Sequence, residues 1–142
     1  MKKLSDIYNK YREIILYLIF GFFTTLISLV VYYGLVITII NPDNGIELQV
    51  ANIISWVVGV LFAYVTNRRY VFKSRNNKKL EEFIKFTGAR VSTLLLDMVI
   101  MFIFVTMLKY NDKIFKIVSQ ILVIIGNYIL SKLFIFNKNL ER

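Results

Sequence analysis

The feature of this sequence that most limits its fold is a series of four long apolar runs. Residues 14–40 and 48–67 contain no charged side chain, and residues 91–108 and 117–136 contain one each. About 20 apolar residues in a helix cross the hydrocarbon core of a bilayer, which is about 30 Å thick. The sequence therefore predicts an all-α integral membrane protein with four transmembrane helices.

Composition excludes most soluble activities. Hydrophobic residues make up 57% of the 142 residues, more than a water-soluble domain of this size buries, so the surplus is expected to face lipid. The chain has no cysteine and no histidine, which removes thiolate chemistry, the usual general base and the commonest metal ligands. A glycine-rich phosphate loop and a paired-aspartate metal motif are also absent from the sequence. We expect no enzymatic activity, no cofactor and no bound metal.

Basic residues are distributed unevenly between the connections. Four precede the first apolar run, none lies between the first and second runs, and eight lie in residues 68–90. Cytoplasmic loops of membrane proteins are enriched in lysine and arginine. We therefore expect a multi-pass protein with both termini and the middle connection in the cytoplasm. The net charge of +9 serves orientation and contact with membrane lipids, and no nucleic-acid partner is expected.

Two charged segments that precede apolar runs are amphipathic. In residues 4–15 and 80–91, apolar side chains recur at helical spacing. Each segment is predicted to form a short amphipathic helix in the membrane interface before the chain enters the bilayer.

The two halves of the chain resemble each other. Residues 69 positions apart match around the first and third runs, and residues 64 positions apart match around the second and fourth; the pairs include Thr24 with Thr93, Ser28 with Asp97, Tyr64 with Tyr128, Arg68 with Lys132, and Phe72 with Phe136. This pattern predicts an internal duplication. We expect a single transmembrane domain over residues 1–142, with repeat one at about 4–75 and repeat two at about 78–142. Each repeat holds two crossings, so the repeats are parallel and related by an axis along the membrane normal.

An acidic residue lies inside the third apolar run. An ionised carboxylate there costs about 2.5–3.5 kcal/mol on the insertion scale, so Asp97 requires a compensating partner. Arg90, seven residues earlier, and Lys132, near the end of the fourth run, are the expected partners. The pair is either a structural lock between the third and fourth helices or part of a polar site for a charged or sugar substrate.

Polar side chains also line the second and fourth runs. Gln120, Asn127 and Ser131 are separated by seven and four residues, which places them along one side of a helix. Asn52 begins a stripe of polar and small residues on the second run. Such stripes serve helix packing, or they line a groove in which sugar hydroxyls satisfy the amides. The predicted polar groove consists of Asp97, Gln120, Asn127, Ser131 and Asn52.

A basic and aromatic segment ends each predicted repeat. The first exit, residues 67–72, holds Asn67, Arg68 and Arg69, and the second exit, residues 131–136, holds Lys132. Arginine suits phosphate because its planar donors bind oxygens in pairs. A topology anchor within an aromatic belt is the alternative. The predicted phosphate-binding residues are Asn67, Arg68, Arg69, Arg90 and Lys132.

Four segments of the chain resemble the GtrA family of small membrane proteins of cell-surface polysaccharide synthesis: residues 20–28, 63–72, 83–97 and 127–136. The family pattern commonly has a second glycine, an asparagine, an acidic residue and an asparagine where this chain has Phe22, Thr24, Ser28 and Ala63. Site residues are therefore carried over at Asn67, Arg68, Arg69, Asp97, Asn127 and Lys132.

The resemblance implies a flippase in the cytoplasmic (inner) membrane of a bacterium. Its substrate would be a polyprenyl-phosphate-linked monosaccharide, passed to membrane glycosyltransferases that decorate a polysaccharide, O-antigen or teichoic acid. The alternative is a scaffold without transport activity that holds a membrane glycosyltransferase or the synthase of the lipid-linked sugar. Four helices alone enclose little space for a groove, so a homodimer is compatible with either role.

Overall fold

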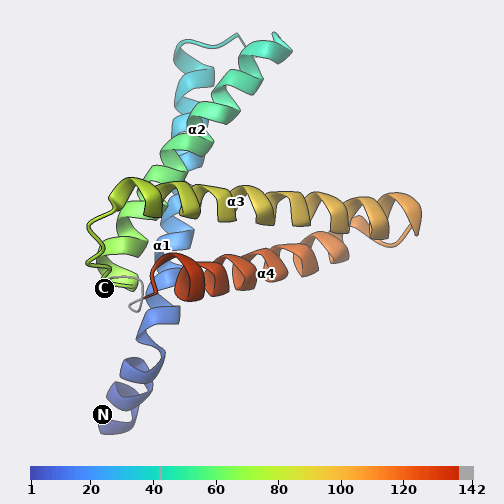
Figure 1. Ribbon diagram of the computed structural model, residues 1–142. Helices are drawn as coiled ribbons and strands as arrows, with labels where there is room; N and C mark the ends of the chain where they lie inside the picture. Colours follow the sequence, from blue (N-terminus) through green and yellow to red (C-terminus); the bar gives the residue numbers. More distant parts are fainter. Residues whose placement is uncertain (42, 138–142) are drawn as a thin grey trace. The chain divides into compact units, whose positions relative to one another are not determined.

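A computed structural model describes residues 1–41 and 43–137. The chain divides into two compact units, Met1–Lys73 and Ser74–Arg142, and each is built around one helical hairpin (Figure 1). All regular secondary structure in the described residues is helical.

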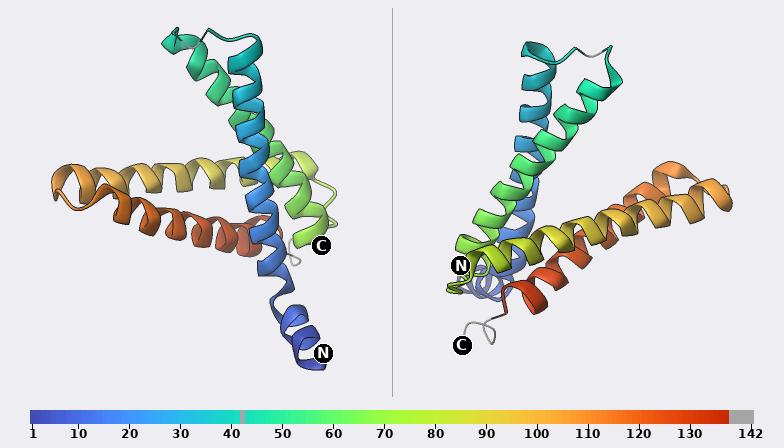
Figure 2. Two further views of the ribbon diagram at one scale, coloured as in Figure 1. Left: turned by 180° about the vertical axis from the view of Figure 1, so that it is seen from behind. Right: turned by 45° about the horizontal axis from the view of Figure 1, so that its top comes forward.

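The first unit pairs α1, Lys2–Thr38, with α2, Gly45–Thr66, which continues into a π-helical turn, η1, at Asn67–Val71. Asn44 begins α2, because its side-chain oxygen accepts hydrogen bonds from the backbone N–H groups of Ile46 and Glu47 at 3.1 and 3.5 Å. Figures 1 and 2 show α1 and α2 side by side.

The second unit repeats this plan with two π-helical turns. α3, Lys79–Met101, ends in η2, Phe102–Met107, and α4, Asp112–Leu130, ends in η3, Ser131–Ile135. Asn111 caps α4 by accepting hydrogen bonds from Lys113 N and Ile114 N at 3.0 and 3.2 Å. α3 and α4 lie side by side in all three views (Figure 2).

The four predicted transmembrane helices are confirmed: four helices are long and apolar enough to cross a membrane. The amphipathic segments, however, are the first turns of α1 and α3 and not separate helices. With 37 residues, α1 is about 55 Å long, so its charged start extends beyond a core of about 30 Å. Nothing in residues 2–38 breaks the helix, because this stretch contains no proline.

An aromatic pair closes the base of each hairpin. Tyr17 meets Phe72 with ring centroids 6.4 Å apart and planes at 59°, and Phe86 meets Phe136 at 6.0 Å and 56°. All four rings are buried, whereas many aliphatic side chains elsewhere in the described helices are exposed, as lipid-facing residues are. The two pairs occupy positions that correspond at the offsets of 69 and 64. The duplication itself stays a prediction from the sequence.

Gly59 allows α1 and α2 to approach each other. A Cβ atom at this position would collide with the hydroxyl oxygen of Ser28, and it would lie 3.6 Å from the methyl group of Thr24. Small residues at such crossings bring helices into close van der Waals contact in a membrane, where no hydrophobic force drives their association.

We expect Gly59→Ala to lower the thermal stability of the purified protein in detergent by about 1 kcal/mol, because Ser28 must move to admit the methyl group. Adding Ser28→Ala should restore the melting temperature, since the colliding hydroxyl is then gone. Gly34→Ala, on the same hairpin with nothing within 4 Å of the new Cβ, is the matched control. Equal melting temperatures for the Gly59 and Gly34 variants would contradict the close contact.

Candidate functional site

The first exit is shaped by its π-helical turn. The backbone N–H of Phe72 donates to the carbonyl oxygen of Asn67 at 2.9 Å, which closes the turn over five residues. Arg68 is half-buried, and its guanidinium donates to the Tyr64 hydroxyl at 3.5 Å. Arg69 is exposed, with its guanidinium carbon 5.6 Å from the ring centroid of Tyr70. Among these side chains Arg69 is therefore the one placed to reach a ligand.

Asn67 lies at the start of this turn with its side chain buried. Its amide oxygen receives no hydrogen bond in the part of the chain that the structure describes. A buried acceptor without a donor is costly and uncommon. A donor from a ligand or a water molecule would complete the first exit.

The second exit has the same backbone closure and a corresponding cation. Phe136 N donates to the carbonyl oxygen of Ser131 at 2.8 Å. Lys132 is exposed, and its ammonium donates to the hydroxyl of Tyr128, four residues earlier, at 3.3 Å. Arg68 and Tyr64 have the same four-residue spacing in the first exit. The predicted phosphate ligands Arg68 and Lys132 thus share a hydrogen bond to a tyrosine four residues earlier, although Arg68 is half-buried and Lys132 is exposed.

Asp97 forms the centre of a polar cluster between α3 and α4. Its carboxylate accepts hydrogen bonds from Lys116 Nζ at 2.7 Å, Ser119 Oγ at 2.6 Å and Gln120 Nε2 at 3.4 Å. The predicted groove residues Asp97 and Gln120 are therefore brought together. Lys116 and Ser119 were missing from the predicted site.

The prediction that Arg90 or Lys132 pairs with Asp97 is wrong. The ion-pair partner is Lys116, in the second turn of α4. Lys132 lies 16 residues further along the same continuous helix, about 24 Å away along its axis, and therefore at the other end of the hairpin. Arg90 is two turns before Asp97, and its guanidinium lies 5.1 Å from the ring centroid of Phe86.

A second polar contact lies nearer the second exit. The Thr93 hydroxyl donates to the amide oxygen of Asn127 at 2.8 Å, and both residues are buried. Asn127 thus pairs across the helices one turn of α3 away from Asp97. We call these residues the α3/α4 seam: Thr93, Asp97, Lys116, Ser119, Gln120 and Asn127.

The remaining groove residues are placed differently. Ser131 is buried at the start of the second exit. Asn52 lies on α2 in the other unit, where its side chain is exposed and its backbone carbonyl accepts a hydrogen bond from Ser55 Oγ at 2.8 Å. The corresponding part of the first hairpin is the close contact of Ser28 with Gly59. That hairpin is therefore packed through small residues where the second one is polar.

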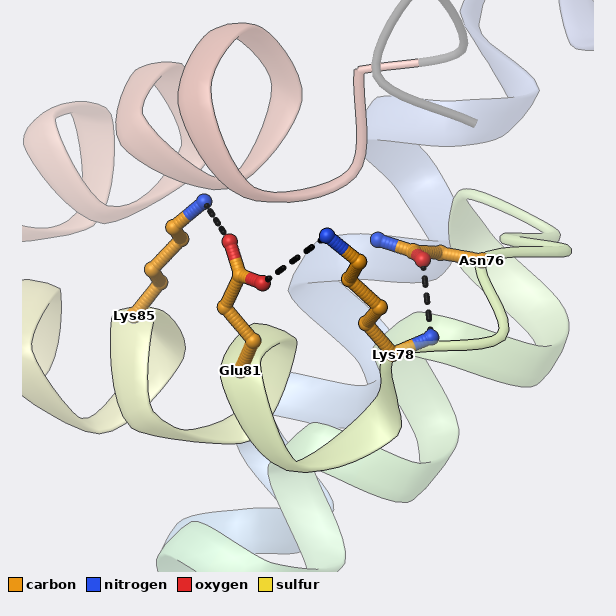
Figure 3. A network of polar contacts seen from close by, with 4 residues as sticks. All are labelled: Asn76, Lys78, Glu81 and Lys85. Atoms are coloured by element: carbon orange, nitrogen blue, oxygen red, sulfur yellow. Dashed lines mark hydrogen bonds and ion pairs between the residues drawn. The ribbon is translucent and has the colours of Figure 1, made fainter. Parts of the chain in front are cut away.

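The charged start of α3 is organised by exposed ion pairs (Figure 3). Glu81 contacts Lys85 at 2.7 Å and Lys78 at 3.8 Å, and the Asn76 side chain accepts from Lys78 N at 2.9 Å. Exposed pairs of this kind contribute little to stability. Glu81 neutralises part of the positive charge of the middle connection.

The described residues contain no group of three or more histidine, cysteine, aspartate or glutamate side chains able to hold a metal ion. Asp97 is the one acidic residue of the seam, so the seam offers no pair of carboxylates for general acid and base chemistry. What the arrangement provides is hydrogen bonding and charge inside an apolar hairpin.

Two membrane hairpins, each ending in a basic and aromatic exit, define a small multi-pass membrane protein of four spans. The family described as the GtrA/DPMS transmembrane domain matches residues 16–136. The chain belongs to this family, as the resemblance of the exits and of residues 83–97 predicted.

Curated relatives cover nearly the whole chain. It is 37% identical over 131 residues to the cell wall teichoic acid glycosylation protein GtcA of Listeria monocytogenes serovar 1/2a, covering 90% of this chain and 87% of the relative. A protein of the same name from Listeria innocua is 37% identical over 96% of this chain and 92% of its own length. The membrane protein YwcD of Bacillus subtilis is 34% identical, over 89% of this chain and 98% of its own length.

Proposed function

We propose that the protein is a flippase for a polyprenyl-phosphate-linked monosaccharide in a bacterial cytoplasmic membrane. The observation that carries this proposal is the second hairpin, which has an exposed cation at one end and a charged, hydrogen-bonded cluster between its apolar helices. An intramembrane charge that is held by partners is typical of a substrate pathway. A lipid-linked sugar carries the matching groups, an anionic phosphate and several hydroxyls.

In this proposal the exits bind the phosphate. Arg69 supplies an exposed guanidinium, Arg68 and Lys132 supply cations next to tyrosine hydroxyls, and the unpartnered amide oxygen of Asn67 accepts from a hydroxyl of the lipid-linked sugar. Arg90 adds positive charge on α3, two turns before Asp97. Arginine is suited to this role because two of its N–H groups bind two phosphate oxygens at once.

The polar groove then carries the sugar past the hydrocarbon core. Asp97 and Gln120 offer a carboxylate and an amide inside the hairpin, and Asn127 and Ser131 continue the polar path toward the second exit. Sugar hydroxyls both donate and accept, so they satisfy groups that lipid chains leave unpaired.

Orientation and partners follow from the same proposal. With both termini in the cytoplasm, the exits face the leaflet in which the lipid-linked sugar is made. A membrane glycosyltransferase consumes the sugar on the outer face, and this consumption drives net transport without catalysis by the protein. The Listeria relatives are named for teichoic acid glycosylation, which supports teichoic acid as the acceptor. Two copies of the chain would complete the wall around the groove.

The test is reconstitution into liposomes with a fluorescent short-chain polyprenyl-phosphate monosaccharide. We expect the protein to accelerate exchange of this probe between leaflets over protein-free vesicles, and to leave a fluorescent phosphatidylcholine unaffected. Exchange at the protein-free rate would reject transport. Co-purification of the protein with a glycosyltransferase in that case would favour the scaffold role.

A further inference from the structure

The ion pair between Lys116 and Asp97 has an unusual balance of exposure. The Lys116 side chain is 48% exposed and the Asp97 side chain 13%. An ammonium has three donors, and among the described residues Lys116 uses one of them, on Asp97 at 2.7 Å. The carboxylate is enclosed, whereas the ammonium keeps donors that an incoming anion can use.

Lys116 is also placed opposite the second exit along one helix. α4 and η3 carry Lys116 and Lys132 16 residues apart, about 24 Å along the axis, and no charged residue lies between them. This separation approaches the thickness of the hydrocarbon core. One helix thus presents a cation near each end of the crossing, and the one at the far end from the second exit, Lys116, belongs to the seam.

We propose that Lys116 is a second phosphate-binding site, which receives the phosphate of the transported lipid after the exits, and that Asp97 is the resident anion that this phosphate displaces. The inference rests on the proposed function. A phosphate that leaves the exits enters apolar surroundings, where an unpaired anion is costly, and Lys116 is the cation of the seam, deeper along α4 than Lys109 and Lys113. The exchange replaces the ion pair of Lys116 with Asp97 by an ion pair of Lys116 with phosphate, and Asp97 is then held by its neutral hydrogen-bond donors.

The surroundings of Asp97 allow this exchange. When Lys116 turns to phosphate, the carboxylate keeps its hydrogen bonds from Ser119 at 2.6 Å and Gln120 at 3.4 Å. When the lipid departs, Lys116 returns to Asp97. Asp97 is therefore a competitor of the substrate, and it prevents the phosphate from binding too tightly to leave.

Competition makes a distinctive prediction for Asp97→Asn. Lys116 becomes free in every molecule, so the affinity of the purified protein for a sugar-free polyprenyl phosphate should rise about tenfold. The leaflet exchange of the fluorescent lipid-linked sugar should fall by a similar factor, because release becomes slow. In Asp97→Asn/Lys116→Gln the gain in affinity should vanish, whereas Asp97→Asn/Lys116→Arg should retain it.

The variant Asp97→Asn/Lys116→Gln removes both charges, so it leaves no unpaired charge in the seam. Its affinity therefore shows whether Lys116 binds phosphate or only forms a structural ion pair with Asp97. Unchanged affinity in Asp97→Asn, or a gain that persists without Lys116, would overturn the phosphate site. So would loss of the gain on adding phosphatidylglycerol, which would assign Lys116 to ordinary anionic lipid. Exchange by the wild-type protein at the protein-free rate would instead reject the flippase, and the affinity measurement would still decide whether Lys116 binds phosphate.

Discussion

Replacing Arg69 with lysine is expected to lower the affinity for polyprenyl phosphate and the rate of leaflet exchange by about tenfold, although the charge is retained. Arg69 is exposed at the first exit and lies against the ring of Tyr70, so its planar group is held where two oxygens can be bound together. An ammonium is a compact charge and does not reproduce this geometry. Binding to lipid nanodiscs and exchange in liposomes measure the two quantities.

Arg12→Lys in the charged start of α1 is the matched control, because it makes the same chemical change at a residue that belongs to neither exit. It should leave affinity and exchange unchanged. If Arg69→Lys behaves like this control while Arg69→Ala abolishes membrane accumulation, the first exit is a topology anchor and not a phosphate site.

Removing Lys116 is expected to lower the stability of the protein more than removing Asp97. Lys116→Leu leaves Asp97 enclosed in the hairpin without its cation, at a cost of about 3 kcal/mol, which should strongly reduce accumulation in the membrane. Asp97→Leu should cost less, about 1 kcal/mol, because Lys116 is one turn from the start of α4 and its long chain reaches the interface. Melting temperatures in detergent and membrane yields compare the variants.

The double replacement Asp97→Leu/Lys116→Leu should recover stability to at least the level of Asp97→Leu, since a hydrophobic pair replaces an ion pair without leaving a charge behind. Equal losses of stability in Asp97→Leu and Lys116→Leu would show that the Lys116 side chain is as enclosed as that of Asp97. That result would remove the open donors on which the second phosphate site depends.

The four crossings were predictable because their signal is strong and local. A helix of apolar residues that is long enough to cross a bilayer is stable mainly as a transmembrane helix. The short connections after the first and third runs predicted that the first and second helices, and the third and fourth helices, form hairpins. Asp97 and Asn127 were predictable as polar positions for the same reason, since a polar side chain stands out in an apolar run.

The ion-pair partner of Asp97 could not be predicted from the bounds of the uncharged runs, because these bounds differ from the ends of the helices. The fourth run begins at residue 117, which left Lys116 among the loop cations, although α4 begins at Asp112. The Asn111–Asp112 pair is a helix-start signal that identifies Lys116 as part of the helix. Pairing across a hairpin depends on how far each helix extends, and counting charged residues does not measure this.

The π-helical turns were also missed, because they depend on backbone hydrogen bonds and leave the hydrophobic pattern intact. They have a geometric consequence for η1. A hydrogen bond closed over five residues inserts one residue into the turn, and one residue of an α-helix corresponds to about 100° of rotation about its axis. A helical wheel of constant period drawn from Gly45 through Phe72 therefore misplaces Phe72 by about a quarter of a circle relative to Gly59. Each exit thus holds both kinds of side chain: Phe72 and Phe136 are buried at the base of their hairpins, whereas Arg69 and Lys132 are exposed.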